Sequence, residues 1–298
     1  MTTPRRPSQP GTPAAAGRRA GTHPAPPRTP ASADLALLAG RLTDRDRELC
    51  RLLHEHRVLT TSQIQQLAFG SLNVAQHRLL ALARLGVLER FRPVWTHGGG
   101  SAPWHYVLGP AGAAVLAAEQ GTASAQLGYR RDRVLAIAHS QRLSHQTGVN
   151  GFFCALAGHA RRHPDSVLLA WWSERACADR WGHVVRPDGY GRWRDPGGEV
   201  DFFLEYDTGT EPLDRLLAKV DAYAELAAVS EIDTPVLFWL PGPGREAALH
   251  HALGRHGPAV TLATAAARSG GHPTGRVWLP AGASGPRRTL AALGEPPL

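Results

Sequence analysis

The stretch FLEYDTGTEPLDRLLAKVDAY, residues 203–223, joins an apolar strand pattern, a short turn and a helix that carries the only lysine of the chain. Lys219 follows Glu205 by fourteen residues, whereas the other 32 strong bases are all arginine. The pKa of an ammonium shifts readily on burial, while a guanidinium stays charged. The retained lysine therefore indicates a local role, with chance survival as the plain alternative.

The segment EVDFFLEYD, residues 199–207, predicts a strand with carboxylates on one face. Strict alternation sends Val200, Phe202, Leu204 and Tyr206 to one side and Asp201, Phe203, Glu205 and Asp207 to the other. Neighbouring carboxylates on a central strand are costly unless a cation or a base meets them. The helix that Pro212 opens carries Arg215, Lys219 and Tyr223 on one face, so it can supply such a cation.

The flanking segments predict an α/β unit. SVLLAWWSE (166–174) and WGHVVRPDG (181–189) predict two earlier strands, the second ending at Pro187 and Asp188, and TPVLFWL (234–240) predicts a later one. Residues 127–164 predict a long helical region before them, with Val149, Phe152, Phe153 and Leu156 on its core side. Its histidines, His139 and His145, are expected to pack and to form hydrogen bonds. The order is helix, three strands, helix, strand.

The N-terminal half predicts three short helices followed by a hairpin. Thr43 with Asp46 and Thr60 with Gln63 have capping-box spacing, and a third helix near 71–85 ends at Gly86. The third helix is expected to turn Val74, Leu79, Leu82 and Leu85 inward. The strands VLERFRPVW (87–95) and WHYVL (104–108) then flank a glycine-rich tip, HGGGS (97–101). This order is typical of a winged helix-turn-helix.

A winged helix-turn-helix suggests double-stranded DNA as a partner, because its second motif helix can lie in the major groove beside a backbone-contacting hairpin. The candidate contacts are Asn73, Gln76, His77 and Arg78 on the third helix and Arg90 and Arg92 on the wing. The alternative is a protein-docking module in which Arg78 and Arg84 are simply solvated.

Composition bounds the remaining possibilities. The net charge is +8, and five of the arginines lie in residues 1–33 without any acid. No apolar run is long enough for a membrane span or a secretory signal, so a cytoplasmic protein without a membrane partner is expected. Cys50, Cys154 and Cys177 are too scattered for a disulfide framework and are expected to be small apolar residues.

These patterns give an α+β fold in four parts. Residues 1–32 are a disordered basic tail, 33–125 a winged helix-turn-helix, 126–285 an α/β domain with a central mixed sheet, and 286–298 a loose C-terminus. A helical patch at 246–257 and the strand-like GRVWLP at 275–280 fall within the third part.

The motifs RPDG, EYDTGT, Lys219 and Tyr223, in this order after a winged helix, resemble the replication-relaxation family of actinobacterial plasmids and mobile elements. The α/β part resembles the PD-(D/E)xK nuclease core. That resemblance implies catalytic roles for Asp188, Glu205, Asp207 and Lys219, with Asp188 and Glu205 as ligands of Mg²⁺. The usual motif has its lysine where this chain has Asp207, although some relatives of the fold supply it from the next helix.

Three hypotheses about function follow from the resemblance. The first is a DNA-binding factor of plasmid or mobile-element replication, relaxation or mobilisation whose nuclease-like domain is inactive, with Asp207 in a buried salt bridge to Lys219 or Arg215. Plasmid replication or relaxosome proteins would be its further partners. The second is a Mg²⁺-dependent endonuclease or nicking enzyme, and the third is a winged-helix transcriptional regulator. A homodimer is an option for the assembly.

Overall fold

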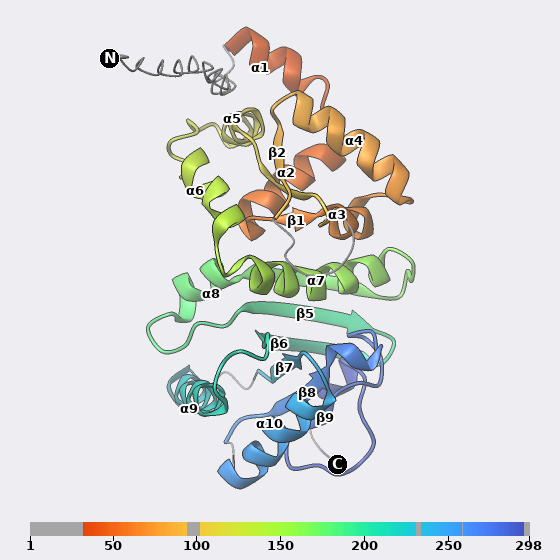
Figure 1. The fold of residues 1–298 in the computed structure, drawn as a ribbon, viewed down its shortest axis with the longest axis vertical. Coiled ribbons are helices and arrows are strands. Elements are labelled where there is room, and N and C mark those ends of the chain that lie inside the picture. The colour runs from red at the N-terminus through yellow and green to blue at the C-terminus, as the bar shows by residue number, and fades with distance from the viewer. Residues whose placement is uncertain (1–31, 94–101, 231–233, 258, 295–298) are drawn as a thin grey trace, which may run out of the picture.

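The computed structural model describes residues 32–93, 102–230, 234–257 and 259–294, which form two units packed against each other (Figure 1). The expected α+β class is confirmed. The predicted tail, except Ser32, and the predicted tip at 97–101 lie outside these residues. None of the helices in the described ranges is long and apolar enough to cross a membrane.

The N-terminal unit consists of five helices and three short strands. Its helices are α1 (Ser32–Ala39), α2 (Asp44–His56), α3 (Thr61–Ala68), α4 (Leu72–Arg84) and α5 (Pro110–Glu119). Its strands are β1 (Leu59–Thr60), β2 (Leu88–Phe91) and β3 (His105–Leu108), which form an antiparallel sheet of order β1-β3-β2.

Local signals fix the helix ends in this unit. Both predicted capping boxes are present, at the starts of α2 and α3. Gly86 has a φ of 70°, the left-handed conformation that ends a helix at low cost. Leu79 and Leu82 of α4 are fully buried as expected, but the prediction for Val74 is wrong, because its side chain is 54% exposed.

The C-terminal unit is a six-stranded mixed sheet with helices on both faces. Its helices are α7 (Leu143–Ala160), α8 (Glu174–Trp181), α9 (Leu213–Ser230) and α10 (Pro243–His256). The short helix α6 (Arg131–Leu135), which precedes α7, packs on the N-terminal unit beside β3. Its strands, in both chain and spatial order, are β4 (Val167–Ser173), β5 (Gly189–Asp195), β6 (Gly198–Tyr206), β7 (Val236–Leu240), β8 (Leu262–Ala266) and β9 (Leu279–Pro280). The pairs β6–β7 and β7–β8 are parallel, and the other pairs are antiparallel.

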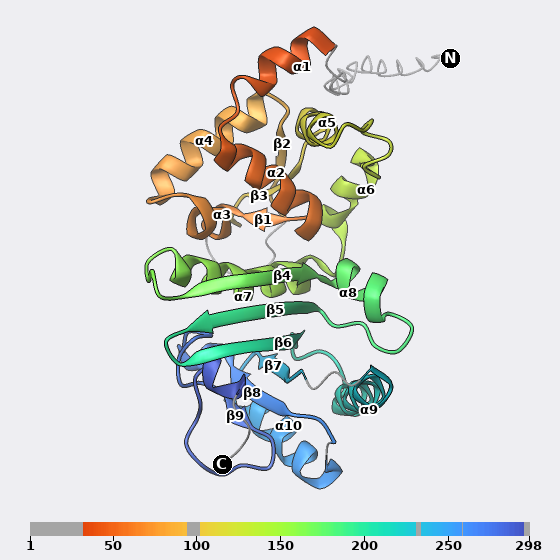
Figure 2. The same ribbon diagram turned by 180° about the vertical axis from the view of Figure 1, so that it is seen from behind.

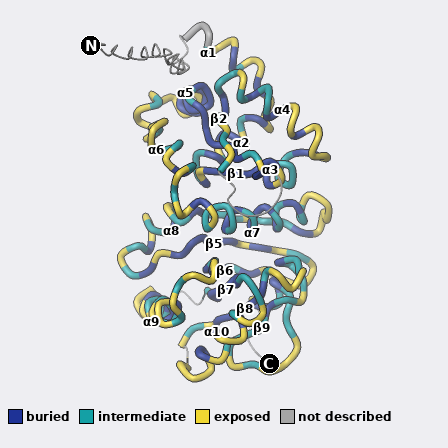
Figure 3. The backbone as a smooth tube through the Cα atoms, viewed as in Figure 1, coloured by how far each residue is buried: buried dark blue, intermediate teal, exposed yellow. Residues whose placement is uncertain are grey.

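Each face of this sheet has its own core, as Figures 1 and 2 show. On one face, α7 packs Phe152 and Phe153 against Phe202 and Leu204 of β6. On the other face, α8, α9 and α10 cover Phe203 and Phe238. The predicted alternation along β6 is therefore correct, and the dark core of the sheet in Figure 3 follows from it.

Two predictions for the C-terminal unit are wrong. The second strand begins at Gly189 and does not end at Asp188. Residues 174–181 form α8, which the hydroxyl of Ser173 caps, and residues 182–188 form a loop. Trp181 and Val185 are apolar because they enter the core under α9. The C-terminus is also not loose throughout, since Leu290 and Ala291 are fully buried against the sheet.

Helix α7 lies between the two units and contacts both (Figure 2). Its Cys154 belongs to the core of the N-terminal unit. The side chain of Asn150 donates hydrogen bonds to the carbonyls of His56 (3.0 Å) and Val58 (2.6 Å). The His56 ring stacks on Trp171 of β4 with a centroid distance of 3.7 Å. All three cysteines are buried and unpaired, as expected.

Candidate functional site

The side chains of Glu205, Lys219 and Tyr223 meet between β6 and α9. Glu205 is 1% exposed. Lys219 Nζ lies 2.6 Å from its Oε2, and the Tyr223 hydroxyl donates to its Oε1 at 2.6 Å. Strand alternation turns Glu205 toward α9, and the four-residue spacing of Lys219 and Tyr223 places both on the facing side of that helix.

Asp188 lies beside this group, immediately before β5. Its Oδ2 accepts a hydrogen bond from the backbone N–H of Tyr206 at 2.8 Å. Its Oδ1 lies 3.0 Å from Nε2 of His145, which comes from α7. We call Asp188, Glu205, Lys219, Tyr223 and His145 the Glu205 cluster. It draws its members from β6, α9, α7 and the segment before β5.

Burial and mutual charge shift the pKa values of the cluster. Burial, together with the nearby Asp188, raises the pKa of Glu205 to about 7, against the opposing effects of Lys219 and Tyr223. Burial opposes the charged form of Lys219, but Glu205 and Asp188 outweigh it and raise the Lys219 pKa. The pKa of His145 is likewise raised, because Asp188 outweighs the burial of the ring. Glu205 therefore titrates near neutral pH.

Asp207 does not join the cluster. Its Oδ2 accepts from Nε of Arg245 on α10 at 2.6 Å, and its Oδ1 accepts from the N–H of Gly209 at 2.7 Å. Arg245 also donates to the carbonyl of Glu211. The predicted pairing of Asp207 with Lys219 or Arg215 is therefore wrong: Lys219 pairs with Glu205, and Arg215 is exposed. Asp207 instead fixes the turn between β6 and α9 to α10.

The six candidate DNA contacts differ in their surroundings. Asn73, Gln76 and His77 are exposed along the first half of α4. Arg78 is engaged within the protein, because it pairs with the buried carboxylate of Asp46 and donates to the carbonyl of Arg41. On the hairpin, the guanidinium groups of Arg90 and Arg92 lie over the Trp104 ring, 4.1 and 4.3 Å from its centroid.

A family model described as replication-relaxation matches residues 50–237. The chain belongs to the replication-relaxation family. Comparison with curated proteins and with solved structures gives no match. The matched range covers more than half of the chain and contains Asp188, Glu205, Asp207 and Lys219.

The carboxylates of this replication-relaxation protein are poorly suited to Mg²⁺ as they are arranged. Magnesium takes carboxylate and water oxygens in an octahedral shell. All four oxygens of Asp188 and Glu205 already have a partner, namely His145, the Tyr206 N–H, Lys219 and Tyr223. In addition, the described residues contain no group of three or more His, Cys, Asp and Glu side chains that could hold a metal ion.

The structure brings together Asp188, Glu205 and Lys219, which the sequence analysis names, and adds two residues that it does not name as site residues, Tyr223 and His145. The spacing along α9 predicts that Tyr223 shares a helix face with Lys219, but it does not indicate a partner for the Tyr223 hydroxyl. His145 lies 43 residues before Asp188, and no local pattern connects the two. Gly148, one turn after His145, permits the contact: a Cβ there would lie 2.3 Å from the Tyr206 ring. That ring packs edge-on against His145.

Proposed function

We propose that this replication-relaxation protein binds double-stranded DNA through α4 during replication, relaxation or mobilisation of a plasmid or mobile element. The N-terminal unit acts as a winged helix, and the C-terminal unit is a nuclease-like platform that does not cleave DNA. The observation that carries this proposal is the exposed first half of α4.

The exposed face of α4 has the composition of a groove-reading surface. Asn73, Gln76 and His77 can contact base edges, and amide side chains pair well with adenine. Leu72 and Val74, on the same half of the helix, are 47% and 54% exposed. Apolar side chains in such positions suit thymine methyl groups. Because the N-terminal part of a recognition helix contacts the bases, this half of α4 is the part that matters.

Positive charge on the hairpin complements α4. Arg90 and Arg92 are exposed on or next to β2 and are held against Trp104. Guanidinium groups in this place can contact the phosphates beside the groove. Arg78 takes no part in the proposed interface, because its charge is matched by Asp46.

The burial and pairing of the Glu205 carboxylate support a non-cleaving platform. The order α7, β4, β5, β6, α9 and β7, with α8 inserted between β4 and β5, supports the comparison with the helix, three strands, helix and strand of a PD-(D/E)xK core. However, Lys219 and Tyr223 already occupy both oxygens of Glu205 at 2.6 Å. A group in this state stabilises the junction between β6 and α9, and its exposure of 1% leaves little access for a ligand.

A Mg²⁺-dependent endonuclease is the second candidate, favoured by the convergence of Asp188, Glu205 and Lys219. In that case Asp188 and Glu205 would bind the metal ion, which would supply an activated water for phosphodiester hydrolysis. Lys219 would then stabilise charge on the phosphate. Asp207, as the partner of Arg245, would keep a structural role.

Both candidates can be tested with the full chain. From a pool of random duplexes, the proposal predicts enrichment of one site, and Asn73→Ala with Gln76→Ala should abolish the enrichment. Gln120→Ala, at an exposed amide after α5, is the control. Supercoiled plasmid incubated with Mg²⁺ should remain supercoiled. Mg²⁺-dependent nicking that disappears in Asp188→Asn and Lys219→Met would replace the platform with the endonuclease, and no enriched site would overturn DNA recognition by α4.

A further inference from the structure

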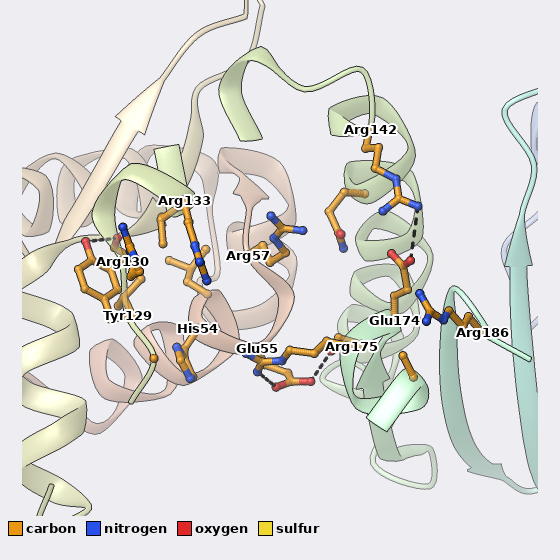
Figure 4. A pocket seen from close by; sticks show the side chains of 17 residues that line it. His54, Glu55, Arg57, Tyr129, Arg130, Arg133, Arg142, Glu174, Arg175 and Arg186 are labelled. Carbon is orange, nitrogen blue, oxygen red and sulfur yellow. Dashed lines mark hydrogen bonds and ion pairs between the residues drawn. The ribbon is translucent and has the colours of Figure 1, made fainter. Parts of the chain in front are cut away.

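A cavity of about 360 Å³ lies between the N-terminal and C-terminal units, away from α4 (Figure 4). Its wall is formed by the end of α2, the segment 128–134, the start of α7, the start of α8 and Arg186. Cavities of this size fall in the range of ligand sites, which often form where two units meet.

The lining of the cavity is strongly basic. It contains six arginines, Arg57, Arg130, Arg133, Arg142, Arg175 and Arg186, and its carboxylates are Glu55 and Glu174. We call this group the arginine cavity. Figure 4 shows the arginines spread across it, from Arg130 at one end to Arg142 and Arg186 at the other. The lining thus has an excess of positive charge that the protein itself does not neutralise.

The ion pairs of the cavity show which of its arginine side chains remain without a partner. Glu55 is 2.8 Å from Arg175 and accepts from the Ser173 hydroxyl, and Glu174 is 3.5 Å from Arg142. Arg130 pairs with Asp132, just outside the lining, at 3.3 Å. The guanidinium groups of Arg57, Arg133 and Arg186 have no hydrogen bond or ion pair with any described residue. Each of the three is exposed, so a guanidinium fork remains available to an anionic group.

The backbone at Arg57 is strained in a way that supports a binding role. Arg57 has φ 70° and ψ −48°, and the N–H of Val58 donates to the carbonyl of His56 at 2.8 Å, which makes a γ-turn. Among the described residues, it is the only non-glycine with a positive φ. The fully buried Asn150 holds this turn through the carbonyls on both sides of Arg57. Strain that the surroundings enforce is concentrated at functional sites.

The far end of the arginine cavity leads toward the Glu205 cluster. Arg142 precedes His145 by three residues on the same segment, and Arg186 precedes Asp188 by two. In Figure 4, Arg142 and Arg186 both lie near Glu174, at the same end of the cavity. A chain of phosphates passing along the arginines would therefore continue to the edge of the nuclease-like sheet.

We propose that the arginine cavity binds the phosphate backbone of single-stranded DNA, as a contact separate from α4. Arginine pairs bidentately with phosphate, and a row of spaced arginines matches successive phosphates better than one small anion. A duplex, whose major groove alone is about 12 Å wide, does not fit a cavity of this volume. The Tyr129 ring in the lining offers a surface on which a base can stack.

The proposal is tested by fluorescence anisotropy of the full chain with a labelled thymidine oligonucleotide of twelve residues. The variant Arg133→Gln/Arg186→Gln should weaken binding about tenfold or more. It should also reduce the slope of log K against log salt by about 1.4, since each single-strand phosphate contact contributes about 0.7. Arg255→Gln, at an exposed arginine in the last turn of α10, should leave both quantities unchanged.

Further binding measurements distinguish this site from α4 and from a nucleotide pocket. Cavity variants should retain binding to the selected duplex, and Asn73→Ala/Gln76→Ala should retain binding to the oligonucleotide. An oligonucleotide affinity that is absent, or that falls equally in Arg255→Gln, would overturn the proposal even if α4 binds duplex. If thymidine monophosphate competes with the labelled oligonucleotide as strongly as unlabelled oligonucleotide does at equal molar concentration, the cavity is a nucleotide site and the proposal is overturned.

Discussion

The Glu205 cluster and the arginine cavity are both rich in charge, but they differ in how the charges are matched. In the cluster, every carboxylate oxygen of Asp188 and Glu205 has a protein partner, and Glu205 is 1% exposed. In the cavity, six arginines face two glutamates, and Arg57, Arg133 and Arg186 are exposed without a partner among the described residues.

This difference separates charges that hold the fold from charges that remain available to a ligand. Removing one member of a buried pair leaves the other without compensation and lowers stability. An exposed arginine contributes little to stability, so its loss is expected to affect only what it binds. Substitutions in the Glu205 cluster should therefore change the free energy of unfolding, whereas substitutions in the arginine cavity should change affinity.

The largest expected effect is that of Lys219→Met. It removes the cation that favours the ionised form of Glu205, so the folded protein must either bury an unpaired carboxylate or take up a proton at neutral pH. The free energy of unfolding should fall by up to about 3 kcal/mol, the low end for a buried pair. The low end applies because the side chain of Lys219 remains 31% exposed and is partly solvated. Urea denaturation measures the loss, with Arg215→Met, an exposed neighbour on α9, as the control. Equal effects of the two variants would remove the Glu205 cluster as a stabilising unit.

A second effect concerns pH. Because burial raises the pKa of Glu205 to about 7, the folded protein binds this proton more tightly than the unfolded chain, whose glutamate titrates near 4.5. The stabilisation from that proton is complete below about pH 4.5 and is lost as the pH rises through 7. The raised pKa of His145 acts in the same direction.

Glu205→Gln isolates this contribution. Its amide can still accept from Lys219 and donate to the Tyr223 oxygen, but it does not titrate. Relative to Glu205→Gln, the parent protein should lose about 2 kcal/mol of stability between pH 5 and pH 7. Parallel stability curves for the two proteins over this range would contradict the raised pKa.

The smallest effect has the opposite sign. Arg57→Gly relieves the strain of a positive φ in the folded protein but makes the unfolded chain more flexible. We expect a net increase of about 1 kcal/mol in the free energy of unfolding. The same variant should bind the thymidine oligonucleotide more weakly, because it removes a guanidinium group from the arginine cavity. Thermal unfolding and anisotropy on one preparation measure both. A loss of stability would mean that Arg57 holds the fold, as the Glu205 cluster does.

The sequence predicted the contacts that are close along the chain. Alternation along β6 and the four-residue spacing in α9 place Glu205 opposite Lys219, and only one turn connects the two elements. Capping residues predicted α2 and α3 for the same reason. Local spacing was sufficient because each of these contacts lies within one element or two consecutive ones.

Contacts between distant elements could not be predicted in this way. Arg245 reaches Asp207 from α10, and His145 reaches Asp188 from α7, so both depend on how helices pack on the sheet. The apolar character of Val74 predicts a core position, yet α4 turns its side chain outward. The apolar residues of 181–189 suggested a strand, although Trp181 and Val185 anchor a helix and a loop.

The central claim is that α4, and not the Glu205 cluster, carries duplex recognition. It is tested most directly by titrating the selected duplex with Asn73→Ala/Gln76→Ala and with Glu205→Gln in parallel, after circular dichroism has verified that both fold. We expect the α4 variant to lose at least about tenfold in affinity, equivalent to about 1.4 kcal/mol, while Glu205→Gln binds as the parent protein does. An unchanged α4 variant beside a weakened Glu205→Gln would contradict the account.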